Sequence, residues 1–205
     1  MKESARTIIS WLKKPRTGWV IRGIWDKAET VLQHTKKVVR AAKIYGKHIS
    51  SIDYEKFVKM ALYHDFAEHK EKDYTPWEIS KDEKYCRERA VMEIIRDSYG
   101  FHNGQEIHDL WIEFEARETL EAKTLFQLDK LDAAVQALEY EKKGHSSVTD
   151  FYPDTLQKLS DPTLKKIFEI LLRKEFHHVS FYKQYFLLLE LNGDERMFYQ
   201  QMQKA

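Results

Sequence analysis

The scarcity of helix-breaking residues constrains the fold of this chain more than any other feature of its sequence. The 205 residues include 7 glycines and 4 prolines. The segment "TLEAKTLFQLDKLDAAVQALEYEKKG", residues 119–144, contains neither residue type before its final glycine. Because glycine and proline interrupt helices and are frequent in turn-rich β proteins, their scarcity predicts long helices. Helical periodicity dominates and strand signals are weak, which predicts an all-α fold.

Periodicity and capping residues divide the chain into separate helices. Asp53 is a predicted N-cap, Ser80 and Glu83 form a predicted capping box, and Asp161 with Pro162 makes a favourable first helical turn. Residues 15–24, "PRTGWVIRGI", do not follow a helical pattern and are interpreted as an ordered loop. The expected helices cover approximately residues 3–14, 27–46, 53–69, 80–100, 103–119, 119–144, 160–176 and 179–191.

Charge and composition exclude several classes of function. The formal net charge is +1, so the chain has no overall positive field that would attract polymeric nucleic acid. No apolar run approaches the roughly 18 residues that a membrane span needs. Lysines and an arginine interrupt the N-terminal segment early, which argues against a signal peptide. The single cysteine, Cys86, cannot form an internal disulfide and is interpreted as a small core residue. A reducing cytoplasm is the expected location.

Four ionisable residues occupy helix positions that should be apolar. His34 interrupts the inward stripe of the helix over 27–46, and His64 does the same in the next helix, with Asp65 beside it. Asp129 lies in the apolar stretch "LFQLDKLDAAV", where a carboxylate is costly unless it is paired or coordinated. Two imidazoles and two carboxylates form a mixed ligand set. This set suits one divalent transition metal, namely Mn²⁺, Co²⁺, Fe²⁺ or Zn²⁺.

Each of these residues also has an ordinary structural interpretation. A single histidine on an apolar face is more often a satisfied core residue than a ligand. Asp129 could pair with Lys130 or Arg117, and Asp132 could simply be a solvated helix position. Their joint order is much harder to explain by chance. It consists of a histidine, an HD pair about 30 residues later and an aspartate about 65 residues further.

That order is the point at which the sequence resembles a known family. His34, His64-Asp65 and Asp129 match the H…HD…D signature of the HD-domain metal-dependent phosphohydrolases, in which they would be the metal ligands. The blocks "PRTGWVIRGI", "HDFAEHKEKDYTP" and "LWIEFEARETLEAKTLFQLDKLDAAVQALEYE" resemble the 5'-deoxynucleotidase branch, the YfbR-like proteins. The resemblance implies a single HD-domain helical bundle over residues 1–205. Its motif-bearing core covers about 12–144, and additional C-terminal helices form an extension over about 145–205.

The resemblance also implies roles for residues around the metal. Glu68 would orient or deprotonate the attacking water, and Asp73 would supply a proton to the leaving 5'-oxygen or help to hold the water. Arg16 would contact the phosphate and Trp19 the sugar or base of a nucleotide. Two further residues would shape the sugar pocket, where this branch disfavours a ribose 2'-hydroxyl: Thr75 and Pro76.

The chemistry is consistent with these residue types. A metal can neutralise a phosphomonoester and generate a nucleophile near neutral pH, and a guanidinium matches phosphate through its fork of donors. The expected activity is conversion of deoxynucleoside 5'-monophosphates to deoxynucleoside and phosphate. The alternatives are a nucleoside triphosphate or alarmone hydrolase of the same fold, and a non-catalytic nucleotide-binding HD domain. A homodimer is common in the branch, and the apolar segment "SFYKQYFLLLELNG" could pack within the domain or form a subunit interface.

Overall fold

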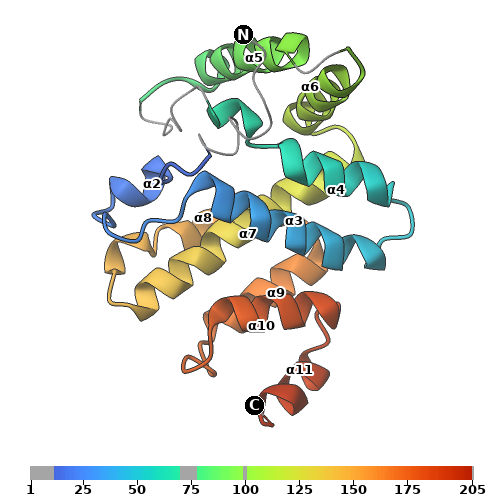
Figure 1. The fold of residues 1–205 in the computed structure, drawn as a ribbon. Coiled ribbons are helices and arrows are strands. Elements are labelled where there is room, and N and C mark those ends of the chain that lie inside the picture. The colour runs from blue at the N-terminus through green and yellow to red at the C-terminus, as the bar shows by residue number, and fades with distance from the viewer. Residues whose placement is uncertain (1–11, 70–77, 99–100, 205) are drawn as a thin grey trace.

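The computed structural model describes residues 12–69, 78–98 and 101–204, and these residues confirm the predicted all-α fold. Within these ranges the extended structure is limited to one isolated antiparallel bridge between Pro15 and Thr30. The helices are α2 (Thr17–Val20), α3 (Val31–Tyr45), η1 (Gly46–His48), α4 (Tyr54–Tyr63), η2 (Phe66–His69), α5 (Lys81–Ser98), α6 (Phe101–Ala116), α7 (Leu120–Lys142), η3 (Ser146–Val148), α8 (Phe151–Lys158), α9 (Pro162–Leu172), α10 (Phe181–Glu190) and α11 (Glu195–Met202) (Figure 1).

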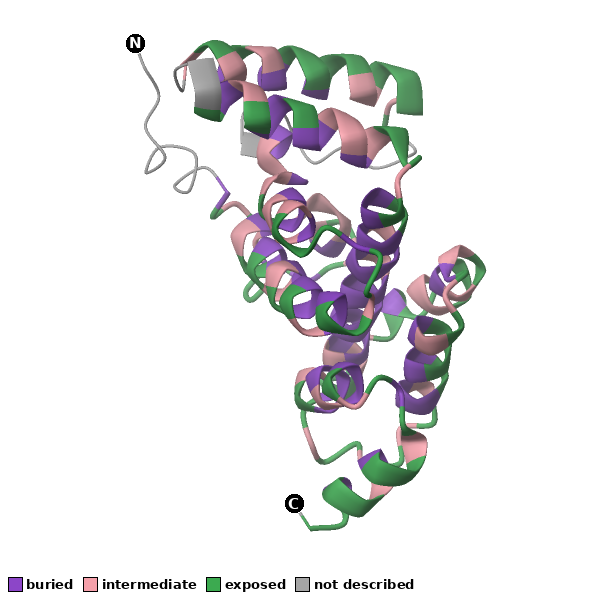
Figure 2. Ribbon diagram, turned by 90° about the vertical axis from the view of Figure 1, so that its right-hand side faces the viewer, coloured by how far each residue is buried: buried purple, intermediate pink, exposed green. Residues whose placement is uncertain are grey.

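Helix α7 is the central element of the fold. It packs against α3, α4, α6, α8, α9 and α10, and buried residues occur on every side of it. A helix that is apolar all round belongs in the interior of a protein, which explains why this long segment is not amphipathic. Figure 2 shows the buried residues gathered where the helices face one another, with exposed residues on their outer sides. Asp129 and Asp132 on α7 are therefore held inside the protein.

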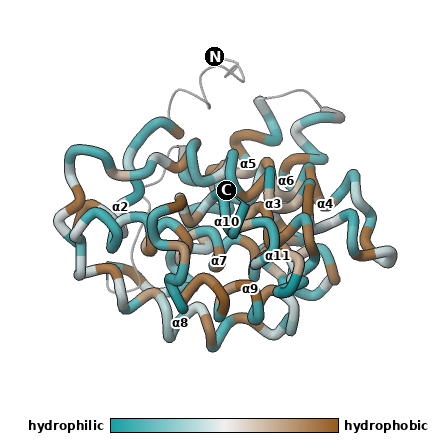
Figure 3. Tube along the Cα trace, turned by 90° about the horizontal axis from the view of Figure 1, so that it is seen from below, coloured by the Kyte–Doolittle hydropathy of each residue, from teal (hydrophilic) through white to brown (hydrophobic). Residues whose placement is uncertain are grey.

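The C-terminal helices share their apolar core with the helices that carry the predicted motifs. Phe168 on α9, Leu188 on α10 and Phe198 on α11 belong to one buried cluster with Val38 on α3 and Leu128 on α7. The apolar segment predicted over 179–191 packs as α10 against α3, α7 and α9. In Figure 3 hydrophobic and hydrophilic stretches alternate along the chain, as expected for helices with one buried face. Among the described residues, no helix is both long and apolar enough to cross a membrane.

Side-chain caps determine where several helices begin. Thr30 accepts a hydrogen bond from the backbone N–H of Gln33, and the Gln33 side chain accepts one from the backbone N–H of Thr30. This reciprocal cap starts α3 at Val31, later than the predicted start at residue 27. The predicted caps are confirmed at Asp53 and Asp161, and Ser80 Oγ accepts from the N–H of Glu83 at 3.2 Å.

Several elements differ from the sequence-based expectation. The predicted loop over 15–24 contains the short helix α2, and α4 ends at Tyr63, before a turn and the 3₁₀ segment η2. The short helices α8 and α11 were not predicted, because each is only about two turns long and gives a weak periodic signal. Cys86 is exposed, so its interpretation as a core residue is wrong. Most of the helix predicted over 3–14 lies outside the described residues.

Candidate functional site

Three separate elements bring the four predicted metal ligands together. His34 extends from α3, His64 and Asp65 follow α4, and Asp129 extends from α7. His34 Nε2 lies 2.9 Å from Asp129 Oδ1 and 3.7 Å from Asp65 Oδ2, and His64 Nε2 lies 3.2 Å from that same Asp65 oxygen. Each side chain therefore contacts at least one other member of the set. The arrangement is a single buried cluster of two imidazoles and two carboxylates.

The end of α4 explains how His64 and Asp65 reach the same point. Adjacent residues within a continuous helix point about 100° apart and do not face each other. Because α4 ends at Tyr63, the chain turns at these two residues before η2 begins. His64 Nδ1 donates to the backbone carbonyl of Ala61 at 2.8 Å, so Nε2 is the ring nitrogen that faces the cluster.

The orientation of His64 provides a test of whether this donor set fits a cation. Its Nε2 is buried and has no hydrogen-bond partner among the described residues, although a carboxylate oxygen of Asp65 lies 3.2 Å away. A buried ring nitrogen without a hydrogen-bond partner and a carboxylate oxygen beside it are both atoms that a divalent transition metal accepts as ligands. His34, His64 and Asp65 each offer an atom within 4.8 Å of the others, which suits a shared cation. The residues present therefore fit a divalent transition metal.

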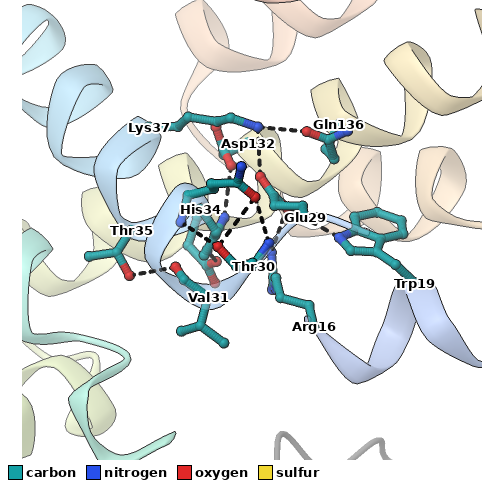
Figure 4. A network of polar contacts seen from close by, with 12 residues as sticks. Arg16, Trp19, Glu29, Thr30, Val31, His34, Thr35, Lys37, Asp132 and Gln136 are labelled. Carbon is teal, nitrogen blue, oxygen red and sulfur yellow. Dashed lines mark hydrogen bonds and ion pairs between the residues drawn. The ribbon is translucent and has the colours of Figure 1, made fainter. Parts of the chain in front are cut away.

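Asp132 is a functional residue that the sequence interpretation missed. Its Oδ2 lies 2.8 Å from His34 Nδ1, and both side chains are fully buried (Figure 4). A histidine whose Nδ1–H donates to a carboxylate is fixed in orientation and presents Nε2 as the free ligand atom. Asp132 lies one helical turn after Asp129 and therefore on the same face of α7, and this spacing is the signal that could have identified it.

A second buried carboxylate, Glu29, supports the back of the cluster. Its Oε2 accepts from the Trp19 indole N–H at 3.1 Å, and its Oε1 accepts from Lys37 Nζ at 2.7 Å (Figure 4). Lys37 also donates to the side-chain oxygen of Gln136 on α7. Glu29 therefore ties the α2 segment to α3 and α7 immediately behind His34. Gln33, the residue directly before His34, is neutral and belongs to the cap of α3. The carboxylates beside His34 therefore come from other parts of the chain.

Trp19 lies in the core, away from the cavity. It is 2% exposed and packs against the rings of Tyr140 and Phe151. Its indole nitrogen is already bonded to Glu29. The predicted contact between Trp19 and a sugar or base would require this packing to open.

Electrostatics favour positive charge at the cluster. Burial and the Arg16 guanidinium act to lower the pKa of His34, but hydrogen bonds to Asp129 and Asp132 outweigh them and raise that pKa to about 10. Burial opposes ionisation of Asp65, yet the adjacent His64 and His34 hold the pKa of Asp65 well below its usual value. Lys130 and His34 similarly keep the pKa of Asp129 low despite burial. The carboxylates thus retain negative charge, and a proton on His34 balances part of it.

A cavity of about 550 Å³ opens beside the cluster, which is large enough for a small organic ligand. Arg16 and Glu68 line it together with His64, Asp65 and Asp129. Glu68 belongs to η2 and is buried. Three residues with predicted roles lie outside the described residues: Asp73, Thr75 and Pro76.

The remaining histidines do not form a second cluster within the described residues. Both candidate metal-binding groups found there include His34, one with His64 and Asp65 and the other with Glu29 and Asp132. The polar sequence around His108 is typical of a solvent-facing or capping residue, but His108 is buried on α6. The side chain of His102 lies outside the described residues.

Replacing Asp132 with asparagine is expected to lower the affinity for Mn²⁺ by about 10- to 100-fold, because His34 would lose the charged acceptor that orients it. Isothermal titration of metal-free protein with Mn²⁺ measures this change. Glu118→Gln is the matched control, because it also replaces a carboxylate with an amide but at an exposed residue. It should leave the affinity for Mn²⁺ unchanged. Equal affinities for Asp132→Asn and the wild type would contradict the orienting role.

Curated proteins from distant eukaryotes are similar to this chain over most of its length. The 5'-deoxynucleotidase HDDC2 of Xenopus laevis is 33% identical over 164 residues, covering 78% of this chain and 80% of that protein. The 5'-deoxynucleotidase HDDC2 of Dictyostelium discoideum is 34% identical over 164 residues, covering 74% of this chain and 86% of its own length.

A solved structure has a similar fold, and a family model identifies the domain. A conserved hypothetical protein from Pyrococcus furiosus superposes with a TM-score of 0.67 and 28% identity, covering 83% of this chain and 99% of the archaeal chain. The HD domain model matches residues 11–171, so the family resemblance continues past the boundary predicted near residue 144. This match includes the buried histidine–aspartate cluster and most of the surrounding helices, and the chain therefore belongs to the HD domain family.

Proposed function

We propose that this protein is a metal-dependent 5'-deoxynucleotidase, which hydrolyses deoxynucleoside 5'-monophosphates to deoxynucleoside and phosphate. The observation that carries the proposal is the convergence of His34, His64, Asp65 and Asp129 beside a cavity that also contains Glu68. The similarity to 5'-deoxynucleotidases over about three quarters of the chain supports the same substrate class.

In this proposal, the cluster holds one divalent transition metal: Mn²⁺, Co²⁺, Fe²⁺ or Zn²⁺. A bound metal would supply Lewis acidity to the phosphoryl group and lower the pKa of the attacking water. His34 and His64 contribute neutral nitrogens, and Asp65 and Asp129 contribute charge. The Asp132 carboxylate orients the His34 ring through Nδ1, and the Ala61 carbonyl orients the His64 ring through its own Nδ1.

The surrounding residues bind the phosphate and move protons. Glu68 accepts a proton as water attacks phosphorus and the bond to the 5'-oxygen breaks. Asp73 returns a proton to that oxygen, and Arg16 binds the phosphate through its guanidinium fork. Thr75 and Pro76 shape the sugar pocket against a ribose 2'-hydroxyl. Arg16 is supported by its place in the cavity wall beside the cluster.

Phosphate release from a panel of nucleotides tests the proposal. Protein loaded with Mn²⁺ or Co²⁺ is incubated with each deoxynucleoside 5'-monophosphate, with matched ribonucleotides and with deoxynucleoside triphosphates. We expect inorganic phosphate from the deoxynucleoside monophosphates and less from the ribonucleotides. Release of pyrophosphate or triphosphate from triphosphates or alarmones would favour the alternative hydrolase. Nucleotide binding without any release would favour a non-catalytic domain.

Metal affinity is expected to rise with pH. In the metal-free protein, the two flanking carboxylates raise the pKa of His34 to about 10, so this ring carries a proton near neutrality. The metal must displace that proton, and the affinity for Mn²⁺ should therefore increase by about tenfold per pH unit below that pKa. Titrations at pH 6 and pH 8 measure the slope, and buffers with different ionisation enthalpies count the released protons. An affinity independent of pH would contradict this protonation state.

Three further expectations remain predictions for this chain. A single domain over residues 1–205 is supported by the apolar cluster that the C-terminal helices share with α3, α4 and α7. A homodimer and a cytoplasmic location are the expected state and compartment. Sedimentation of the metal-loaded protein tests the oligomeric state, and a tagged chain in cells tests the location.

A further inference from the structure

Lys84 on α5 is a cavity residue whose position suggests a role in the proposed reaction. Its ammonium lies 4.0 Å from Glu68 Oε1 and 3.4 Å from Glu88 Oε1. The side chains of Glu68 and Glu88 are 9% and 10% exposed, and all three residues line the cavity beside the histidine–aspartate cluster. A single ammonium thus lies beside the proposed base and a second acid.

This part of the cavity wall contains buried acids with cations between them. Burial raises the pKa of Glu88 to about 7, and the negative charges of Glu115 and Asp65 add to this effect while Lys84 opposes it. Burial also raises the pKa of Glu115, which lines the same cavity. A cation near a buried carboxylate favours its ionised form, and the Lys84 ammonium lies within 4.0 Å of both Glu68 and Glu88.

The local backbone explains why Glu68 needs support from its side chain. Glu68 belongs to η2, a 3₁₀ segment of 4 residues, and 3₁₀ hydrogen bonds have poorer geometry than those of an α-helix. Helix α5 has 18 residues and packs against η2. An ion pair between Lys84 and Glu68 therefore connects a short segment to a long, well-anchored helix.

We propose that Lys84 is a positioning residue for Glu68, in which its ammonium holds the carboxylate of the proposed base at the attacking water. This inference rests on the proposed function of Glu68. It differs from a phosphate contact, because the charge of Lys84 is directed at Glu68 and Glu88. A phosphate contact would raise KM and would act independently of Glu68.

Steady-state kinetics of three variants test the proposal. We expect Lys84→Met to lower kcat by about 10- to 100-fold on deoxynucleoside monophosphates with KM changed less than about threefold, because small displacements of a catalytic group are costly. Lys84→Arg keeps the charge and should recover most of the loss. Lys81→Met removes the same charge from the same wall, one turn earlier on α5. An equal loss in Lys81→Met, or a loss confined to KM, would overturn the positioning role.

A double-mutant cycle then asks whether Lys84 acts through Glu68. Adding Lys84→Met to Glu68→Gln should cost less than about twofold in kcat, since the group that Lys84 positions is already inactive. A full additional loss would show an independent role and overturn the proposal. Thermal unfolding and Mn²⁺ titration of each variant verify that the fold and the metal site are intact.

A structural measurement separates this inference from the proposed function. Crystal structures of the wild type, Lys84→Met and Lys81→Met report the position of the Glu68 carboxylate without any activity. We expect it to move in Lys84→Met alone, and an unmoved carboxylate would overturn the inference. If the wild type releases no phosphate from any nucleotide, the proposed function fails, while the position of Glu68 still tests Lys84.

Discussion

Replacing Asp65 with asparagine is expected to remove bound metal and to lower phosphate release by at least about 10³-fold, because a metal provides several kcal/mol of charge stabilisation in such reactions. One oxygen of Asp65 lies 3.7 Å from His34 Nε2 and 3.2 Å from His64 Nε2, so this carboxylate links the two imidazoles. Asparagine keeps the shape and removes the charge. Metal content after dialysis and phosphate release from a deoxynucleoside monophosphate are the two measurements.

The control for this variant is the same substitution at an exposed position. Asp154 on α8 is exposed and pairs with Lys158, far from the cavity wall, and Asp154→Asn should retain both metal and activity. Circular dichroism establishes that both variants remain helical. Full metal content and wild-type turnover in Asp65→Asn would show that the histidine–aspartate cluster is not the metal centre.

Replacing Glu68 with glutamine is expected to lower kcat by about 10²- to 10⁴-fold while leaving metal content unchanged, because general base catalysis contributes this much and Glu68 is not a member of the ligand cluster. Glu68 is buried in the cavity wall, three residues after Asp65. Glutamine preserves its size and cannot accept the proton. Turnover at saturating substrate and metal analysis of the same samples distinguish the two effects.

Glu83→Gln is the matched control for this second variant. Glu83 is exposed on α5 and pairs with Arg87, so its loss should leave turnover within about twofold of the wild type, as for most surface substitutions. Loss of metal from Glu68→Gln would indicate that this carboxylate is a ligand. Unchanged turnover would require another base for the attacking water.

The helical content and most helix starts were predictable from local signals. Asp53 and Asp161 are side-chain acceptors in front of apolar periodic segments, and both cap helices as expected. Helix α3 begins later than its periodicity predicts, because the reciprocal cap between Thr30 and Gln33 sets its first turn. The break after Tyr63 was missed for a different reason. No glycine or proline follows Tyr63 to mark a helix end, and only the cluster that His64 and Asp65 join shows why the chain turns there.

The candidate site was predictable where a residue type conflicts with its environment. His34 and Asp129 occupy apolar faces, and they lie in contact inside the protein. Trp19 and Asp132 show the limit of this reasoning, since an aromatic residue in a loop and a second acid beside Asp129 have several ordinary interpretations. The indole of Trp19 bonds to Glu29 in the core, and Asp132 contacts a ring 98 positions away in the sequence.

The sequence by itself determined that this chain forms helices and that a few ionisable groups must lie inside them. Periodicity along one helix establishes which residues share a face, and it does so without reference to any other part of the chain. Only the tertiary structure decided that Asp132 orients His34, that Trp19 belongs to the core and that Lys84 lies beside Glu68. The physical reason is that these contacts depend on how helices from distant segments pack against one another, and packing angles and registers are not encoded within any single helix.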